Sequence, residues 1–273
     1  MIGQKELLSR ISGQIARNKF PRFSILIGEK GSGKKEIAYS ISKTMDLAIT
    51  FVDTKADSIR EVIDNAYKIE LPILYVIADA DSMSSASANA LLKVTEEPPK
   101  NAYFIITCEN ADNLLQTIRS RGVTYMLEPY TYEDKCDYLD THKNRPNEED
   151  VEFILEVASN LGEIQTMLNM DISTFRNFVN LVIDNIAEVS DSNSFKIADK
   201  VALKDEEDKY NLKLFWKAFN ALCVDRMTKS DEPLMYARAI AITGDSSQQL
   251  NIRGINKQML FDTWIISIRE EWL

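Results

Sequence analysis

The fold is decided by residues 23–41, which read FSILIGEKGSGKKEIAYSI. An apolar run leads into a glycine-rich loop, residues 28–34, and the loop leads into apolar residues at helical spacing. Strand, glycine loop and helix are the setting that a phosphate-binding loop requires. Gly28, Gly31 and Gly33 allow a tight turn whose N–H groups converge on phosphate oxygens at a helix N-terminus. The sequence therefore predicts a phosphate-binding loop, and the alternative is a glycine-rich surface turn.

The end of this loop departs from the usual pattern. Ser32 lies within the turn, and Lys34 is placed to reach terminal phosphates. The next position is ordinarily Ser or Thr, whose hydroxyl holds Mg²⁺, but here it is Lys35. We therefore expect a loop that can cradle phosphate but lacks a metal ligand.

Length and charge set broad limits on the protein. Its 273 residues suffice for two or three domains with an ample core. No apolar run approaches the roughly 20 residues of a membrane span, and we see no signal peptide, so we expect a cytoplasmic protein without a membrane partner. The formal net charge of −10 argues against strong independent binding to nucleic acid. Any DNA contact has to be local, or shared with basic partners.

Residues that bind metals or form disulfides are sparse. The three cysteines, Cys108, Cys136 and Cys223, are scattered without a CxxC pair, and the single histidine is His142. We therefore expect no metal site and no disulfide framework, and we predict buried free thiols.

Apolar runs alternate with helical spacing over the first half of the chain. Besides residues 23–27, the predicted strands are 48–52, 73–77 and 102–107. Helices are predicted over residues 1–20, after residue 34, from residue 57, from Ser84 to Pro98, and around residues 114–118. Continuously apolar strands that alternate with helices indicate an α/β fold with a parallel sheet covered on both faces.

After Pro129 the pattern becomes helical. Short helices broken at residues 144–147 are predicted to about residue 170, and longer amphipathic helices follow. We interpret their apolar stripes as core, with a partner face as the alternative. The polar stretch 204–208 is interpreted as the start of a solvated helix.

Three further stretches carry a family resemblance. Residues 78–83 read ADADSM, residues 89–99 read NALLKVTEEPP, and residues 117–121 read TIRSR. Over about residues 1–170 the chain resembles AAA+ clamp-loader subunits, which are related to the tau/gamma and delta-prime subunits of bacterial DNA polymerase III and to replication factor C. TIRSR resembles their Ser-Arg-Cys motif, with Gly122 in place of the cysteine.

The resemblance implies a division into three parts. Residues 1–128 correspond to a P-loop α/β domain, residues 129–172 to a small helical lid, and residues 173–273 to a helical collar domain that holds subunits in a ring. We expect these boundaries in the structure.

On this resemblance several catalytic positions are altered. Lys35 stands for the Walker A hydroxyl residue, and Ala78 for the Walker B aspartate. Asp79 stands for the catalytic glutamate, and Gln165 for the sensor-2 arginine. Joint loss of both metal contacts favours a subunit that does not hydrolyse ATP. One interpretation is that the Lys35 ammonium sits where the metal would have been.

Arg121 is the residue that the resemblance marks as active. In the family it is an arginine finger that projects into the ATP site of the neighbouring subunit; the alternative is a surface arginine, and Arg119 is a second candidate. Ser84 and Ser85 begin a helix that faces duplex phosphates in the family, although as N-cap serines they need no DNA.

The resemblance implies a delta-prime-like subunit that helps to load a sliding clamp onto primed DNA, with other loader subunits as partners. No cofactor is expected to be required, and any ATP or ADP binding is expected to be weak and independent of Mg²⁺. Two other functions stay open, namely an active ATPase whose Mg²⁺ is held by unrecognised residues and a stand-alone nucleotide-sensing adaptor.

Overall fold

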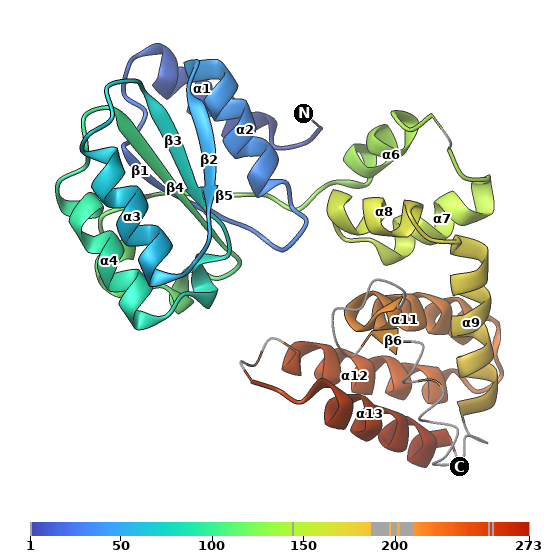
Figure 1. Cartoon of the computed structure of the whole chain (residues 1–273). Helices are drawn as coiled ribbons and strands as arrows, with labels where there is room; N and C mark the ends of the chain where they lie inside the picture. The colour runs from blue at the N-terminus through green and yellow to red at the C-terminus, as the bar shows by residue number, and fades with distance from the viewer. Residues whose placement is uncertain are drawn as a thin grey trace. The chain divides into compact units, whose positions relative to one another are not determined.

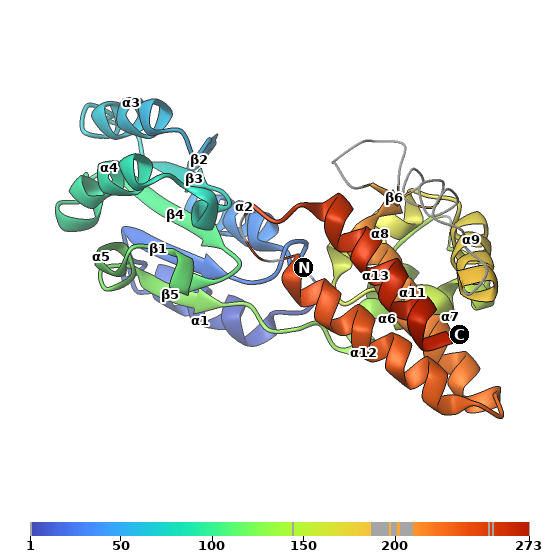
Figure 2. The same ribbon diagram turned by 90° about the horizontal axis from the view of Figure 1, so that it is seen from below.

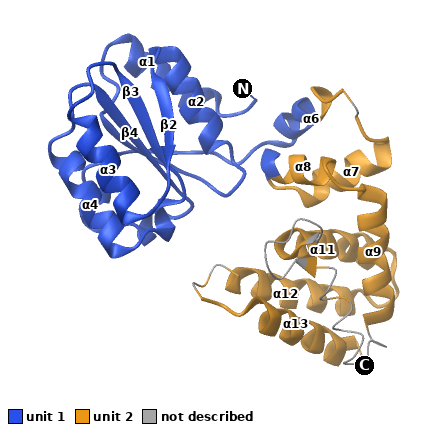
Figure 3. Ribbon diagram, in the orientation of Figure 1, with its two compact units in different colours: residues 1–138, 160–162 blue, residues 139–159, 163–273 orange. Residues whose placement is uncertain are grey.

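The computed structural model describes residues 2–143, 145–186, 197, 201–202, 210–250, 252 and 254–272. The chain divides into two compact units, which are coloured separately in Figure 3. Unit 1 comprises residues 1–138 and 160–162, and unit 2 comprises residues 139–159 and 163–273. Residues 160–162, which lie in sequence between two stretches of unit 2, therefore belong to unit 1.

Unit 1 is built on a five-stranded parallel sheet (Figure 1). Its strands are β1 (Phe23–Ile27), β2 (Ala48–Val52), β3 (Ile73–Ile77), β4 (Ala102–Cys108) and β5 (Val123–Met126). They lie in the order β2-β3-β4-β1-β5. Ile25 of β1, for example, lies opposite Ile106 of β4 and Thr124 of β5. Because parallel neighbours need crossover connections, helices separate the strands in sequence.

Helices cover both faces of this sheet. They are α1 (Lys5–Ala16), α2 (Lys34–Met45), α3 (Ala56–Ala66), α4 (Ser85–Glu96) and α5 (Gln116–Arg119), with two short 3₁₀ turns at Ala80–Ser82 and Ala111–Asn113. Ile25 and Ile27 belong to the core beneath α3, α4 and α5, whereas Leu26 belongs to the core beneath α1 and α2. Successive side chains of a strand point to opposite faces, so burial on both faces explains the continuous apolar runs.

Unit 2 is mainly helical. Its elements are the end of α6 (Tyr132–Asp140), α7 (Glu148–Val157), α8 (Leu161–Leu168), α9 (Ile172–Asn185), β6 (Val201–Ala202), β7 (Tyr210–Asn211), α11 (Leu212–Lys229), α12 (Pro233–Gln249) and α13 (Lys257–Trp272). Trp264 of α13 is fully buried, packs edge-on against Phe219 of α11 at 5.1 Å, and donates its indole N–H to Thr243 of α12 at 2.8 Å. A buried indole needs such a partner, so these contacts fix how the last three helices pack.

The predicted fold class is confirmed, with local corrections. β5 was not predicted, because it is a short edge strand on which only Tyr125 is buried. α5 has four residues, so Leu114 and Leu115 precede it rather than belonging to it. The first helix is shorter than residues 1–20, since Asn18 has a φ of 54° that ends it.

Other sequence predictions have mixed outcomes. Cys108 and Cys223 are buried free thiols as predicted, whereas Cys136 is only half-buried. The stretch 204–208 and Asn144 lie outside the described residues. Among the helices that the structure describes, none has the length and apolar character needed to cross a membrane.

Candidate functional site

The glycine-rich loop connects β1 to α2 within unit 1. Gly31 and Gly33 have φ angles of 86° and 90°, which glycine adopts without the steric cost that other residues meet. The loop begins where Gly28 N donates to Cys108 O at 3.1 Å, and it continues directly into the first turn of α2. The strand, loop and helix that the sequence predicted are therefore present.

Protein donors bond the carbonyl groups of this loop. Lys34 Nζ donates to Gly28 O at 2.5 Å and to Glu29 O at 2.8 Å. The Tyr130 hydroxyl donates to Ser32 O at 2.9 Å. Burial, with nearby carboxylates as a smaller cause, raises the pKa of Tyr130 to about 12, so this hydroxyl stays a donor at neutral pH.

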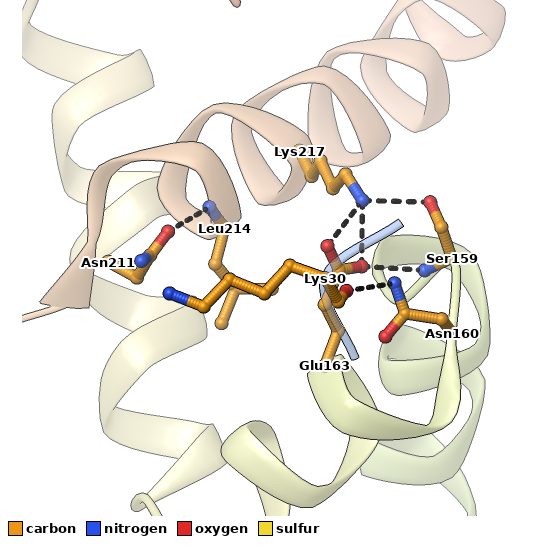
Figure 4. A network of polar contacts seen from close by, with 7 residues as sticks. All are labelled: Lys30, Ser159, Asn160, Glu163, Asn211, Leu214 and Lys217. Carbon is orange, nitrogen blue, oxygen red and sulfur yellow. Dashed lines mark hydrogen bonds and ion pairs between the residues drawn. The ribbon is translucent and has the colours of Figure 1, made fainter. Parts of the chain in front are cut away.

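The carbonyls of Lys30 and Gly31 are bonded by residues 160–162, which follow α7 in sequence. Asn160 Nδ2 donates to Lys30 O at 3.1 Å (Figure 4), and Gly162 N donates to Gly31 O at 3.1 Å. The space is tight, because a Cβ on Gly31 would come within 2.4 Å of Asn160 Oδ1. A Cβ on Gly162 would come within 2.5 Å of Gly31 Cα. Asn160 was not singled out from the sequence, where it lies in an ordinary polar connection between helices.

Carboxylates surround Lys34 at the carboxyl ends of β3 and β4. The side chain is buried, and burial lowers the pKa of Lys34 while Glu109, Asp79 and Asp81 oppose that change. Glu109 N also donates to Asp81 Oδ2 at 2.9 Å. Three negative groups thus act on one buried ammonium, and this edge of the sheet is locally acidic.

Ala78 and Asp79 follow β3, as the sequence predicted. Ala78 offers no polar side-chain atom, and Asp79 is exposed with a φ of 54°. Asp79 N donates to Thr107 Oγ1 of β4 at 3.2 Å. Sequence analysis did not identify Thr107, whose only signal is a hydroxyl inside a buried apolar strand.

Lys35 lies beside the edge strand β2. Its side chain is exposed, and Nζ lies 5.9 Å from the centroid of the Phe51 ring, within the range of a cation–π contact. Among the described residues Lys35 forms no ion pair with a carboxylate. No contact therefore supports the interpretation that its ammonium replaces a metal ion.

Arg121 lies at the surface just after α5. Its guanidinium donates to Thr117 O at 2.9 Å and to Glu96 Oε1 of α4 at 3.0 Å, and the side chain is 37% exposed. At Gly122 a Cβ would come within 2.6 Å of Ile25 Cγ1, so the side chain of a cysteine would require Ile25 to move. The arginine thus stays accessible while its glycine neighbour packs against β1.

The neighbouring candidate residues have local partners. Arg119 pairs with Asp112, within the same loop and helix segment. Ser84 Oγ accepts a hydrogen bond from Ser87 N at 3.1 Å, so the N-cap interpretation is confirmed for Ser84. Ser85 is the exposed first residue of α4.

Gln165 belongs to unit 2, in α8. Its Oε1 lies 3.2 Å from His142 Nε2, and its Nε2 donates to Asn169 Oδ1 at 3.2 Å. On the same helix Glu163 accepts two bonds of 2.7 Å from Lys217 of α11 (Figure 4). These contacts fix α8 within unit 2, and Gln165 brings no charge to the position where the resemblance led us to expect an arginine.

The sheet order, the glycine loop after β1 and the helical second half give this chain the α/β fold of the AAA+ class. A family model described as "DNA polymerase III, delta subunit" matches residues 52–131. The solved structure of a DNA polymerase III gamma subunit-related protein from Thermotoga maritima has the same fold, with a TM-score of 0.58 and 15% identity. That match covers 97% of this chain and 99% of the other.

Curated relatives give the same indication. The chain is 28% identical to DNA polymerase III subunit gamma of Buchnera aphidicola subsp. Schizaphis graminum over 62% of its own length and 56% of the relative's. It is 31% identical to the delta-prime subunit of Haemophilus influenzae over 47% of its own length and 39% of the relative's. The chain thus spans about two fifths to three fifths of these relatives. The family model and the relatives thus make this chain similar to subunits of DNA polymerase III clamp loaders.

Proposed function

We propose that this chain is a delta-prime-like clamp-loader subunit that does not hydrolyse ATP itself. In this role it takes its place in a ring of different subunits and donates Arg121 to the ATP site of a neighbour. The complex loads a sliding clamp onto primed DNA. Residues 1–128, 129–172 and 173–273 would act as the α/β domain, the lid and the collar of that subunit.

The observation that carries the non-hydrolysing role is the state of the nucleotide-binding positions. Ala78 supplies no carboxylate for Mg²⁺, and Lys35 lies against Phe51. The Lys34 ammonium is bonded to two carbonyls of its own loop. Hydrogen bonds to a charged group contribute about 1.5–3 kcal/mol each. A phosphate that draws Lys34 away from both carbonyls therefore has to offset about 3–6 kcal/mol of existing interaction.

Local charge also supports weak nucleotide binding. Asp79, Asp81 and Glu109 already place negative charge around Lys34. In hydrolysing enzymes a divalent cation offsets the charge of the triphosphate. With Ala78 and Lys35 at the two expected metal contacts, repulsion between carboxylates and phosphates opposes binding, and we expect this role to need no nucleotide cofactor.

The position of Arg121 supports its role as a finger. The side chain is at the surface, and its ion-pair partner Glu96 is 56% exposed. Exposed pairs of this kind contribute about 0–1 kcal/mol, so Arg121 can exchange Glu96 for the phosphate of a neighbouring subunit at small cost. An arginine finger increases the rate of phosphoryl transfer roughly 10³–10⁵-fold.

The test is a reconstituted complex of the full chain with the subunits that copurify with it. Arg121→Ala should leave assembly intact and reduce DNA-stimulated ATP hydrolysis by roughly 10³-fold. Arg121→Lys should restore little, because lysine lacks the planar fork that binds phosphate oxygens. Arg119→Ala is the matched control, with the same loss of charge two residues away, and should retain the wild-type rate. Unchanged hydrolysis in an assembled Arg121→Ala complex would remove the finger role.

The same materials distinguish the two alternative functions. Mg²⁺-dependent hydrolysis by the isolated chain that Lys34→Ala abolishes would indicate an active ATPase with atypical metal ligands. Failure of any loader subunit to copurify with the tagged full chain would favour a stand-alone nucleotide-sensing adaptor.

A further inference from the structure

The N-terminal segment has a charge opposite to that of the whole chain. The formal net charge of the protein is −10. Residues 1–22 nevertheless contain one acidic residue, Glu6, and five basic residues: Lys5, Arg10, Arg17, Lys19 and Arg22. A basic segment within an acidic protein is the kind of local surface through which such a chain can contact a polyanion.

The basic residues of α1, together with Arg17 at its C-terminal end, gather on one side of the helix. An open hollow along this side is lined by Lys5, Glu6, Ser9, Arg10, Gly13, Gln14 and Arg17. Leu7 and Ile11, on the other side of α1, are buried in the core of unit 1. With a rise of 1.5 Å per residue, the cations from Lys5 to Arg17 extend over about 18 Å.

Contacts with β5 fix the middle of this surface. Figure 2 shows α1 alongside β5 within unit 1. The guanidinium carbon of Arg10 lies 5.1 Å from the centroid of the Tyr125 ring, and Gln14 Oε1 accepts a hydrogen bond from the Tyr125 hydroxyl. Tyr125 is fully buried, so a rigid part of the sheet orients both side chains.

The three cations of this surface, Lys5, Arg10 and Arg17, outnumber its one acid, Glu6. In the part of the chain that the structure describes, no carboxylate forms an ion pair with Lys5, Arg10 or Arg17. Their positive charge is therefore available to a ligand.

Gly13 has no evident role in internal packing. A Cβ built on it meets no atom within 4 Å, and glycine inside a helix is destabilising relative to alanine. Together with the small side chain of Ser9, it leaves the floor of the hollow open between the cations. That arrangement allows the backbone of a ligand to approach α1 closely.

We propose that this side of α1 binds the phosphate backbone of duplex DNA. Cations spread over about 18 Å match a row of phosphates along a duplex strand, which advances about 3.4 Å per residue. Such contacts position a protein on DNA without reading its sequence. A protein partner fits less well, because the hollow is lined by charged and polar side chains and a glycine, whereas the centre of a protein interface is apolar.

The inference rests on the proposed function only in taking DNA as the polyanion that the complex meets. The test uses the isolated full chain and a fluorescently labelled duplex of about 30 base pairs, by anisotropy at about 50 and about 200 mM salt. The variant Lys5→Ala/Arg10→Ala/Arg17→Ala should bind at least tenfold more weakly at the lower salt concentration. The slope of log K against log salt should decrease by about 2–3, because up to three phosphate contacts are lost.

A charge-matched control separates a site from general electrostatics. Lys43→Ala/Lys68→Ala/Lys100→Ala removes the same charge from other exposed positions of unit 1 and should change affinity by less than about threefold. Gly13→Leu keeps every charge and fills the hollow, so it should weaken binding several-fold, whereas Gly13→Ala should have a smaller effect. Because Gly13→Leu retains Arg10 above Tyr125, it remains informative if the triple variant folds poorly.

Three results would overturn the inference. One is no salt-dependent binding of the duplex by the wild-type chain, and another is equal weakening by the two triple variants. The third is an α1 variant that binds DNA normally but no longer assembles with loader subunits, which would make this surface a protein interface. None of these depends on the ATPase of the Arg121→Ala complex, so failure here leaves the test of the proposed function unaffected.

Discussion

Gly31→Ala tests whether the glycine loop is joined to residues 160–162 as the structure indicates. Gly31 has a φ of 86°, and an alanine in this left-handed region costs about 1–2 kcal/mol. Its Cβ would also lie 2.4 Å from Asn160 Oδ1. Asn160 is 3% exposed, so the amide has little free space and has to move.

Moving that amide breaks the bond from Asn160 Nδ2 to Lys30 O, which contributes about 1 kcal/mol. The total expected destabilisation of unit 1 by Gly31→Ala is therefore about 2–3 kcal/mol. Gly13→Ala is the control, since its Cβ meets nothing within 4 Å and alanine stabilises a helix interior by about 0.5–1 kcal/mol relative to glycine. Two identical substitutions in one unit should thus shift stability in opposite directions.

The assay exploits the distribution of tryptophan. All three tryptophans, Trp216, Trp264 and Trp272, lie in unit 2, so their fluorescence reports that unit, while far-ultraviolet circular dichroism reports both. The first dichroism transition on heating should fall by roughly 6–9 °C for Gly31→Ala, with less change in fluorescence. In an Asn160→Ala background Gly31→Ala should cost only the backbone strain, about 1–2 kcal/mol. Equal destabilisation by Gly31→Ala in the two backgrounds would refute the steric argument.

Three further predictions concern nucleotide, thiols and the Arg121 ion pair. In calorimetric titrations with ADP or ATP, the affinity measured with Mg²⁺ and the affinity measured with chelator should agree within about threefold, because Mg²⁺ lacks its usual ligands. A large gain in affinity on adding Mg²⁺ would contradict the proposed function. Burial raises the pKa of the thiols from 9.0 to about 11 in Cys108 and about 12 in Cys223. Unfolding therefore favours the thiolate form of these two cysteines. Their contribution to the free energy of unfolding is complete below pH 9 and is lost as the pH rises toward 11–12. Chemical unfolding across this range should show the decline, and at pH 8 a thiol reagent should modify Cys136 well before the other two. Glu96→Gln should lower the stability of the protein by less than about 1 kcal/mol. It should also leave Arg121 free to act, so the assembled complex should keep or exceed the wild-type rate of ATP hydrolysis. A loss of rate as large as that of Arg121→Ala would instead make Glu96 essential for positioning the guanidinium.

Most of the sheet could be predicted from the sequence, because buried parallel strands are continuously apolar. β1, β2 and β3 span the predicted residues, and β4 ends one residue later. β5 escaped prediction because an edge strand with one buried residue has no such pattern. Likewise, the apolar residues before α5 resemble helical spacing, but the chain forms only one turn there, since the ψ angles of Leu114 (149°) and Leu115 (133°) are not helical.

The candidate site was predictable only where a motif names its residues. The loop of residues 28–34 was located in this way, and Arg121 was named as a candidate on the same basis. Thr107, Asn160 and Tyr130 were not, because each acts through a contact with a distant part of the chain: Thr107 with Asp79, Asn160 with Lys30, and Tyr130 with Ser32. Such contacts form only in the packed fold, so the local spacing of residues does not predict them.

These contacts also give a physical reason for the glycine loop that does not involve a metal ion. The carbonyls of Gly28 to Ser32 accept bonds from Lys34, from Tyr130 after β5, and from Asn160 and Gly162 after α7. Any side chain at Gly31 or Gly162 would separate the loop from residues 160–162. We infer that the loop serves as a junction at which three segments of unit 1 meet, and a junction of this kind requires the same glycines that phosphate binding does. Its glycines are therefore no evidence of hydrolysis. The proposed loss of hydrolysis depends instead on Lys35 and Ala78, at the positions where the resemblance implies metal contacts and which the junction does not use.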